Sequence, residues 1–292
     1  NTTLFYRDMA KAGELLPQTV GKSQGWVDPW DERSRRRFFS FAKKAHFDIG
    51  VDALWLDATE PEEYVHVTPF ASRTNTSVMR RDDYGRDGEN ETMVAEAVEA
   101  AAGGGMWRQH GDSTAALMNT YSLMTSRAVH EGLRRDFALA QGRRVFSLTR
   151  SSFAGQQASG AALWSGDLTA TWDSLRRQVA SSLNFQASGT PYWTQDIGGF
   201  FRPLGQYDDP DYRLLLLRWF QFGAFTSIFR THGWDSDTEL WHYGEDIAAD
   251  IVYSAVHPRY RMLPYIYSGF RRVETEGWTM QRLLAFDWPE DP

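Results

Sequence analysis

The sequence predicts an α/β fold of the (β/α)8 TIM-barrel type, because short apolar runs alternate with helical tracts along the chain. Polar residues end five of these runs, and Gly or Pro follows each end within a few residues. The strand ends of such a barrel converge on one face, so these polar groups would meet in one pocket. An open doubly wound sheet is the alternative, although no Gly-rich phosphate loop follows a strand. The five ends lie at Asp57, Arg150, Asp167, Asp196 and the Arg230/His232 pair.

The first predicted helix runs from Asp28 to about His46, since an acid followed by Pro is typical of a helix start. Residues 47–50 should form a turn. The nearly unbroken apolar stretch 51–56 then predicts a short parallel strand that is covered on both faces. Asp57 would follow directly at the end of this strand.

Residues 62–112 break this pattern with charged runs and three consecutive glycines. Long loops with little regular structure are usually functional or disordered, so we expect a loop insertion within the barrel domain. Because it follows the strand that carries Asp57, this insertion could act as a lid. Helical periodicity returns from Ser113 to about Arg135.

The rest of the chain repeats a rhythm of strands and helices. Helices are predicted from Trp172, over 211–222 and over 246–276, with interruptions of the last at Pro258 and Pro264. The strands of this part are predicted at 144–149, 161–165, 190–194 and 224–229.

The composition limits the classes of partner. With 42% hydrophobic and 24% charged residues, the 292-residue chain can bury one large core or two modest ones. A net charge of −7 argues against a nucleic-acid partner. There is no cysteine for a disulfide, a thiolate metal site or a nucleophile, and no apolar run is long enough to cross a membrane. The 14% aromatic residues offer faces that stack on sugar rings, although most should fill the core.

Two strand-end acids, Asp57 and Asp167, suggest the paired carboxylates of a sugar-cleaving site. Each also has a purely structural interpretation. Asp57 could cap the turn before Pro61, and Asp167 could be the N-cap of the helix that begins near Trp172.

Several sequence blocks, in order and at plausible distances, closely resemble the catalytic domain of glycoside hydrolase family 31. They cover about residues 25–286 apart from the insertion. The Asp-Ala-Thr-Glu-Pro form of the first block is most similar to bacterial α-xylosidases that act on xyloglucan fragments. The blocks are Trp-Leu-Asp57-Ala-Thr-Glu-Pro, Leu-Thr-Arg150-Ser-Ser-Phe-Ala-Gly, Trp-Ser-Gly-Asp167, Tyr-Trp-Thr-Gln-Asp196-Ile-Gly-Gly-Phe, Phe-Arg-Thr-His232-Gly and Arg261-Met-Leu-Pro-Tyr-Ile-Tyr.

The resemblance implies a nucleophile at Asp57 and a general acid/base at Asp167, in a retaining mechanism that passes through a covalent glycosyl-enzyme. Glu60 is too close in sequence to Asp57 to be the second acid of the pair, so it would orient Asp57 or its loop. Such chemistry needs no metal and no other cofactor, and no His/Asp cluster in the sequence has metal-ligand spacing.

The resemblance also implies four substrate-binding residues. Arg150 would reach the sugar and stabilise the negative charge of the nucleophile, unless it forms a structural salt bridge. Asp196 and His232 would bind sugar hydroxyls, although a histidine at a strand end is often structural. Trp164 would form a wall of the pocket, with plain core packing as the alternative.

The implied substrate is an oligosaccharide that carries a terminal α-linked sugar, and the resemblance favours α-D-xylose on oligosaccharides of the xyloglucan type. An α-glucosidase, an α-transglycosylase or a catalytically incomplete carbohydrate-binding remnant are the alternatives. We expect residues 1–292 to be a partial barrel domain with about strands four to eight, completed by the remainder of the full-length chain. The sequence does not define a compartment.

Overall fold

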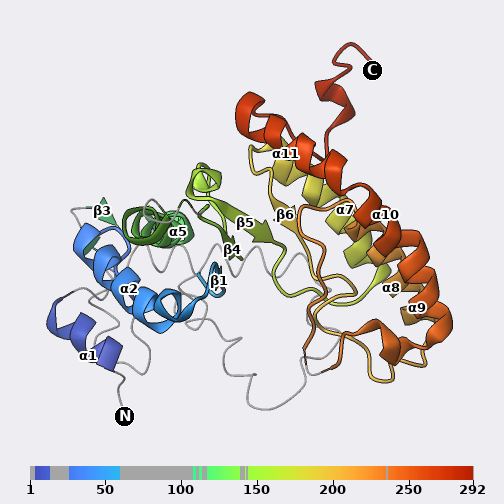
Figure 1. The fold of residues 1–292 in the computed structure, drawn as a ribbon, viewed down its shortest axis with the longest axis horizontal. Coiled ribbons are helices and arrows are strands. Elements are labelled where there is room, and N and C mark those ends of the chain that lie inside the picture. Colours follow the sequence, from blue (N-terminus) through green and yellow to red (C-terminus); the bar gives the residue numbers. More distant parts are fainter. Residues whose placement is uncertain are drawn as a thin grey trace. The chain divides into compact units, whose positions relative to one another are not determined.

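The computed structural model describes residues 4–13, 26–59, 108–109, 112–113, 117–138, 142, 144–234 and 236–291. They belong to two compact units, which Figure 1 shows in colours that follow the sequence. The first unit comprises residues 1–52 and 58–143, and the second comprises residues 53–57 and 144–292. Every described residue to which a site role was assigned lies in the second unit.

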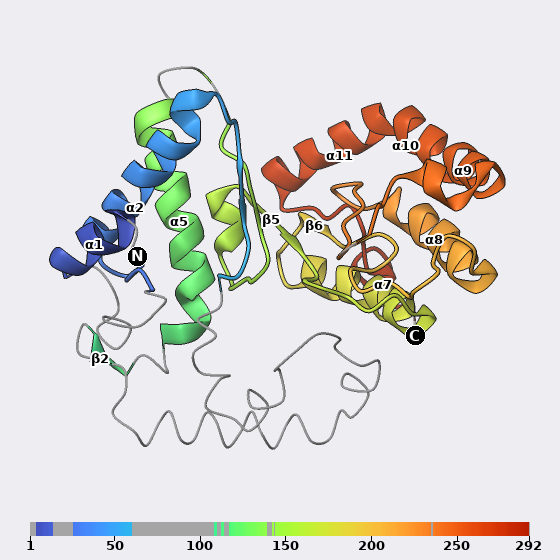
Figure 2. The same cartoon turned by 90° about the horizontal axis from the view of Figure 1, so that it is seen from below.

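The described residues of the first unit are mainly helical. In Figure 2, α2 (Glu32–Ala45) lies beside α5 (Tyr121–Leu133). Phe39 on α2 and Val129 and Leu133 on α5 are buried. The remaining elements are α1 (Leu4–Lys11), the 3-10 turns η2 (Phe47–Ile49) and η5 (Met118–Thr120), the π-helical turn η6 (Arg134–Ala138) and the paired strands β2 (Arg108–Gln109) and β3 (Asp112–Ser113).

Two predicted helix starts in this unit were wrong. The N-cap of α2 is Asp31, whose Oδ1 accepts a hydrogen bond from Arg33 N (2.7 Å). Asp28 instead accepts one from Trp30 N (3.0 Å), which forms a turn before the helix. The second helix, predicted from Ser113, becomes regular α-helix at Tyr121 after the 3-10 turn η5.

The second unit contains a sheet of four parallel strands in the order β1-β4-β5-β6. Leu56 of β1 pairs with Thr149 of β4, which pairs with Leu163 of β5. Consecutive strands are therefore neighbours, and their carboxyl ends share one edge. The strands are β1 (Leu54–Leu56), β4 (Ser147–Thr149), β5 (Ala161–Trp164) and β6 (Trp193–Thr194), all shorter than the sequence predicted.

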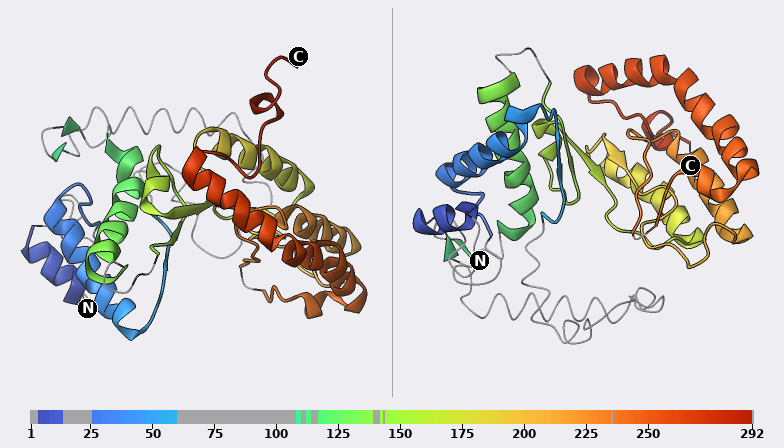
Figure 3. Two further views of the ribbon diagram at one scale, coloured as in Figure 1. Left: turned by 45° about the horizontal axis from the view of Figure 1, so that its top comes forward. Right: turned by 60° about the horizontal axis from the view of Figure 1, so that its bottom comes forward.

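Helices follow the strands and enclose the main core. α7 (Trp172–Ala187) and α8 (Pro210–Gly223) begin at the N-caps Thr171 and Asp209. The core lies between α8 and the following helices and includes Trp219 and Tyr243. Figure 3 shows the arc formed by four consecutive elements, α9 (Glu245–Ile251), η9 (Val252–Val256), α10 (His257–Arg261) and α11 (Leu263–Glu276). The other turns are η7 (Gln156–Ser159), η8 (Leu240–Tyr243) and η10 (Leu284–Phe286).

Three predictions for the second unit need correction. Residues 224–229 are not a strand, because α8 continues to Gly223 and Arg259 donates to the carbonyls of Ala224, Thr226 and Ser227. Pro258 does not interrupt the helical tract, because it lies in the first turn of α10; α10 ends at Arg261, and α11 begins at Leu263 with Pro264 in its first turn. β1 is not covered on both faces, since the Trp55 side chain is 47% exposed.

Candidate active site

The two acids proposed from the sequence meet at one guanidinium group. Asp57 directly follows β1, Arg150 directly follows β4, and Asp167 lies just beyond β5. Arg150 Nη1 is 3.1 Å from Asp57 Oδ1 and 3.9 Å from Asp167 Oδ2. These two carboxylate oxygens therefore lie no more than about 7 Å apart. Both acids are partly open to solvent, with side chains 52% and 33% exposed, so a substrate could reach them.

The local backbone makes this meeting possible. Gly166 has φ of 75°, and a Cβ there would lie 3.3 Å from Arg150 Cδ, so a side chain at this position would crowd the arginine. Ala58, directly after Asp57, has φ of 50°, a left-handed conformation that residues with a Cβ rarely adopt. Strain of this kind gathers at functional sites. The N-cap of α7 is Thr171, which accepts a hydrogen bond from Ser174 N (3.1 Å), so Asp167 is not the cap of that helix.

A second acid and arginine pair lies deeper. Asp196 is 0% exposed, and its Oδ1 accepts a hydrogen bond from Arg230 Nη2 (2.7 Å). Burial raises the pKa of Asp196 to about 7; the charge of Arg230 opposes this rise, and the charge of Asp167 adds to it. Burial also lowers the pKa of Arg230. Asp196 Oδ2 is buried and has no hydrogen-bond partner among the described residues.

His232 lies among aromatic rings beside this pair. Its ring centroid is 4.8 Å from that of Trp55 and 5.1 Å from that of Phe200. Burial lowers the pKa of His232, the nearby Arg230 and Arg202 lower it further, and Asp57 opposes them. The neutral imidazole, which can both donate and accept a hydrogen bond, is therefore favoured.

Trp164 is buried, at 2% exposed, and packs edge-on against Trp55 with ring centroids 5.4 Å apart. The Arg230 guanidinium carbon lies 5.4 Å from the Trp55 ring centroid and 5.8 Å from that of Trp164. These are cation–π distances. In the described structure Trp164 therefore packs in the core, where it supports Arg230 and Trp55.

Two residues of the site were not assigned a role from the sequence. Arg230 was noted at a predicted strand end, but its partner Asp196 is far from it along the chain. Arg202 belongs to no block that the sequence singled out, and its contacts with the Asp196 and His232 segments appear in the folded chain alone. Glu60, expected to orient Asp57, lies outside the described residues.

One cluster of possible metal ligands was not visible as a sequence motif. Ligand atoms of Asp237, Glu239 and His242 lie within 4.8 Å of one another, close to the turn η8. All three side chains are exposed, and exposed acidic groups often gather without an ion. No described helix is long and apolar enough to cross a membrane.

Parallel strand ends that gather three carboxylates and an arginine at one edge are typical of α/β enzymes of the barrel class. A family model described as the glycosyl hydrolases family 31 TIM-barrel domain matches residues 2–269. The chain therefore belongs to glycoside hydrolase family 31. The predicted family and the predicted barrel type are both confirmed.

Known relatives include enzymes with two sugar specificities. The chain is 33% identical over 289 residues to an α-xylosidase of Saccharolobus solfataricus, covering 99% of this chain and 34% of that protein. It is 28% identical over 282 residues to alpha-glucosidase 2 of Bacillus thermoamyloliquefaciens, covering 96% and 30%. The crystal structure of a GH31 α-xylosidase from Xanthomonas citri matches with a TM-score of 0.77 and 28% identity, covering 100% and 30%. The chain thus spans about a third of the length of these relatives.

Proposed function

We propose that the full-length protein is a retaining α-glycoside hydrolase that removes a terminal α-linked sugar, α-D-xylose, from oligosaccharides of the xyloglucan type. The observation that carries this proposal is the Arg150 guanidinium, which lies within 4 Å of both Asp57 and Asp167. Two carboxyl groups about 5–5.5 Å apart are required for retention. The upper bound of about 7 Å between the nearer oxygens is compatible with that spacing.

In the first step Asp57 acts as the nucleophile. Its carboxylate attacks the anomeric carbon, while Asp167 gives its proton to the glycosidic oxygen and the C–O bond to the leaving sugar breaks. The product is a glycosyl ester of Asp57. Arg150, beside both acids, stabilises the negative charge that remains on whichever of them is ionised.

In the second step Asp167 acts as a base. It takes a proton from water, the water oxygen attacks the anomeric carbon, and the ester bond to Asp57 breaks. Asp57 returns as a carboxylate and Asp167 returns protonated. The pair of Asp196 and Arg230, together with His232, would hold the hydroxyl groups of the sugar during both steps, and Trp164 would support them.

The proposal of xylose rests on the Asp-Ala-Thr-Glu-Pro sequence at residues 57–61 and on the α-xylosidases among the relatives. An α-glucosidase is the second candidate, because a relative over nearly the same span is named as one. A pocket closed around C5 would exclude the hydroxymethyl group of glucose. Removal of such a group changes binding by about 1–3 kcal/mol, so a clear difference in kcat/KM is expected.

The nucleophile is tested by trapping. A 5-fluoro glycosyl fluoride added to the full-length protein should label Asp57, as read by peptide mass spectrometry. A label on any peptide that lacks Asp57 contradicts the assignment. Comparison of p-nitrophenyl α-xyloside with the corresponding α-glucoside then decides the substrate, and faster turnover of the glucoside favours the second candidate.

We also propose that residues 1–292 are part of one catalytic barrel domain, with residues 62–112 as an insertion within it and Glu60 as a support of Asp57. The insertion follows the strand that carries Asp57, which is the position expected of a lid. Limited proteolysis with and without xylose should show protection of residues 62–112. Identical cleavage in both conditions contradicts the lid.

A further inference from the structure

Arg202, in the loop after β6, makes contacts that the two chemical steps do not use. Its Nε donates to Gly199 O (2.9 Å), and its Nη1 donates to the Tyr243 hydroxyl (2.8 Å). Its Nη2 donates to Ile197 O (3.1 Å) and to His232 O (3.4 Å). Within the described parts of the chain, no ion pair joins Arg202 to a carboxylate. The guanidinium therefore donates its hydrogen bonds to backbone carbonyls and to one tyrosine hydroxyl.

These bonds join two segments that strand pairing barely connects. Regular pairing of β6 stops at Thr194, and beyond it an isolated bridge joins Ile197 to Thr231 and Trp234 N donates to Phe200 O (2.9 Å). The Asp196–Arg230 pair also joins the two segments. Gly198 and Gly199 have φ of 87° and 81°, so the segment after Asp196 cannot continue as a strand. A Cβ at Gly199 would also lie 2.6 Å from Ala170 Cα. Three carbonyls of these segments, at Ile197, Gly199 and His232, accept hydrogen bonds from Arg202 instead of from a strand.

We propose that Arg202 is a positioning residue, whose guanidinium fixes the segment that carries Asp196 against the segment that carries His232. It thereby sets how the two sugar-binding side chains face each other. The inference rests on the proposed function for what those side chains bind. A planar guanidinium presents five donors in a fixed fork, and its three nitrogens reach four acceptors here, whereas a lysine ammonium has one nitrogen and cannot reach all four.

The guanidinium is itself held in place. Tyr243 is 0% exposed and donates its hydroxyl hydrogen to Gln206 Oε1 (2.7 Å), so its oxygen is oriented to accept from Arg202. Tyr212 donates to Gly198 O (2.9 Å) from the other side of the same segment. A buried network whose members are satisfied is rigid, which suits a positioning role.

The charge of Arg202 gives a second readout. It lowers the pKa of Asp196, which is also influenced by Arg230 and Asp167. It lowers the pKa of His232, which also faces Arg230 and Asp57. Replacement by glutamine removes both the fork and the charge, whereas lysine removes the fork and keeps the charge. The two variants therefore separate geometry from electrostatics.

The first test measures hydrogen–deuterium exchange in the full-length protein. Arg202→Lys should speed exchange in residues 196–201 and in residues 230–234 together. Arg259→Lys is the matched control, because Arg259 likewise donates to three backbone carbonyls, at Ala224, Thr226 and Ser227. It should speed exchange near residues 224–228 and leave residues 196–201 unchanged.

The second test follows kcat and KM on p-nitrophenyl α-xyloside across pH. Both Arg202 variants should lose activity, by up to about 10²-fold in kcat/KM, since a misplacement of about 1 Å has that effect. Arg202→Gln should also move the pH profile to higher pH, because both pKa values rise when the cation is removed. Arg202→Lys and Arg259→Lys should keep the position of the profile.

Folded variants with unchanged exchange in both segments overturn the proposal, as does kcat/KM within twofold of wild type for both Arg202 variants. If the Arg202 variants do not fold, as judged by circular dichroism, Tyr243→Phe removes one acceptor and should speed exchange in residues 196–201 to a smaller extent; no change there overturns the proposal. Absence of turnover by the wild type on both the xyloside and the glucoside is a failure of the proposed function. The exchange test still decides the role of Arg202 in that case.

Discussion

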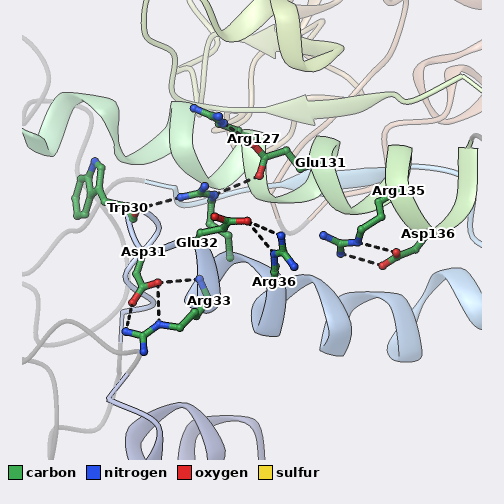
Figure 4. Close-up of polar contacts among 10 residues, drawn as sticks. Trp30, Asp31, Glu32, Arg33, Arg36, Arg127, Glu131, Arg135 and Asp136 are labelled. Atoms are coloured by element: carbon green, nitrogen blue, oxygen red, sulfur yellow. Dashed lines mark hydrogen bonds and ion pairs between the residues drawn. The ribbon is translucent and has the colours of Figure 1, made fainter.

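Two regions of the chain hold their charges in opposite ways. Among the described residues of the first unit, several ion pairs on α2 and α5 are exposed to solvent, although Arg35, which pairs with Glu131, is buried (Figure 4). Arg36 and Glu32 are 2.5 Å apart with side chains 62% and 61% exposed. At the strand ends of the second unit, Asp196 is 0% exposed and pairs with Arg230, whose side chain is 17% exposed.

The balance between burial and pairing differs between the two regions. Burial alone would raise the pKa of Glu131 on α5, but the hydrogen bond from Arg127 and the charge of Arg35 outweigh it, so this pKa is lowered. For Asp196, burial outweighs a close arginine and the pKa is raised. Water screens the exposed ion pairs of the first unit, so these pairs add modestly to stability. The Asp196–Arg230 pair lies at the strand ends, where a substrate could contact it.

The largest expected effect is on catalysis. Asp167→Ala should lower kcat/KM on a xylose-bearing oligosaccharide by about 10²–10⁴-fold, because the leaving oxygen loses its proton donor. Glycosylation by p-nitrophenyl α-xyloside should be less affected, since its leaving group needs no proton. The control is Asp173→Ala on α7, where an exposed acid pairs with Arg176. Less than a tenfold loss on the oligosaccharide would contradict the role of Asp167.

Removal of the buried cation should be costly for stability. Arg230→Met leaves Asp196 buried without its partner, and breaking such a pair lowers the free energy of unfolding by about 3–5 kcal/mol. Urea denaturation of the full-length protein measures this change. A loss below about 1 kcal/mol, the range of exposed pairs, would show that the site is more hydrated than its burial indicates.

Asp196 should also make stability depend on pH. Its folded-state pKa of about 7 exceeds the ordinary 3.8, so the folded protein binds this proton more tightly than the unfolded chain does. The stabilisation is fully present below about pH 4 and is lost as the pH rises through about 7, with an effect on the order of a few kcal/mol. Thermal unfolding between pH 4 and 8 measures it. Asp196→Asn should flatten this part of the curve, and an unchanged slope would assign the effect to another group.

The smallest effect is expected on α2. Arg36→Gln breaks an exposed pair between positions four residues apart, which is worth about 0.3–0.5 kcal/mol, and salt should reduce the difference from wild type. Urea denaturation at low and high ionic strength measures both. A loss above 2 kcal/mol would mean that this surface is not the solvated face that its exposure indicates.

Much of the framework could be predicted from the sequence, because apolar runs that end in polar residues are a local signal. Asp57 and Arg150 were expected at strand ends, and they directly follow β1 and β4. The predicted strand at 224–229 failed for a non-local reason. Its carbonyls bond to Arg259, a residue of α10, and nothing within the segment indicates that partner.

The hydrogen-bond partners of individual residues likewise could not be predicted from the local sequence. Asp28 and Asp31 are both good helix caps, and the geometry of the chain selects Asp31. Arg202 carries no motif, because its importance comes from the carbonyls that two distant segments leave without strand partners.

The sequence by itself determined the family, the strand-end positions of the acids and the absence of cysteine chemistry, since residue type and order suffice for these. The tertiary structure decided which charges meet and which are buried. It placed one guanidinium beside both Asp57 and Asp167, enclosed Asp196 so that its pKa rises, and joined the segments of Asp196 and His232 through Arg202. Distance and exclusion of water control these properties, and both arise when segments far apart in the chain pack together.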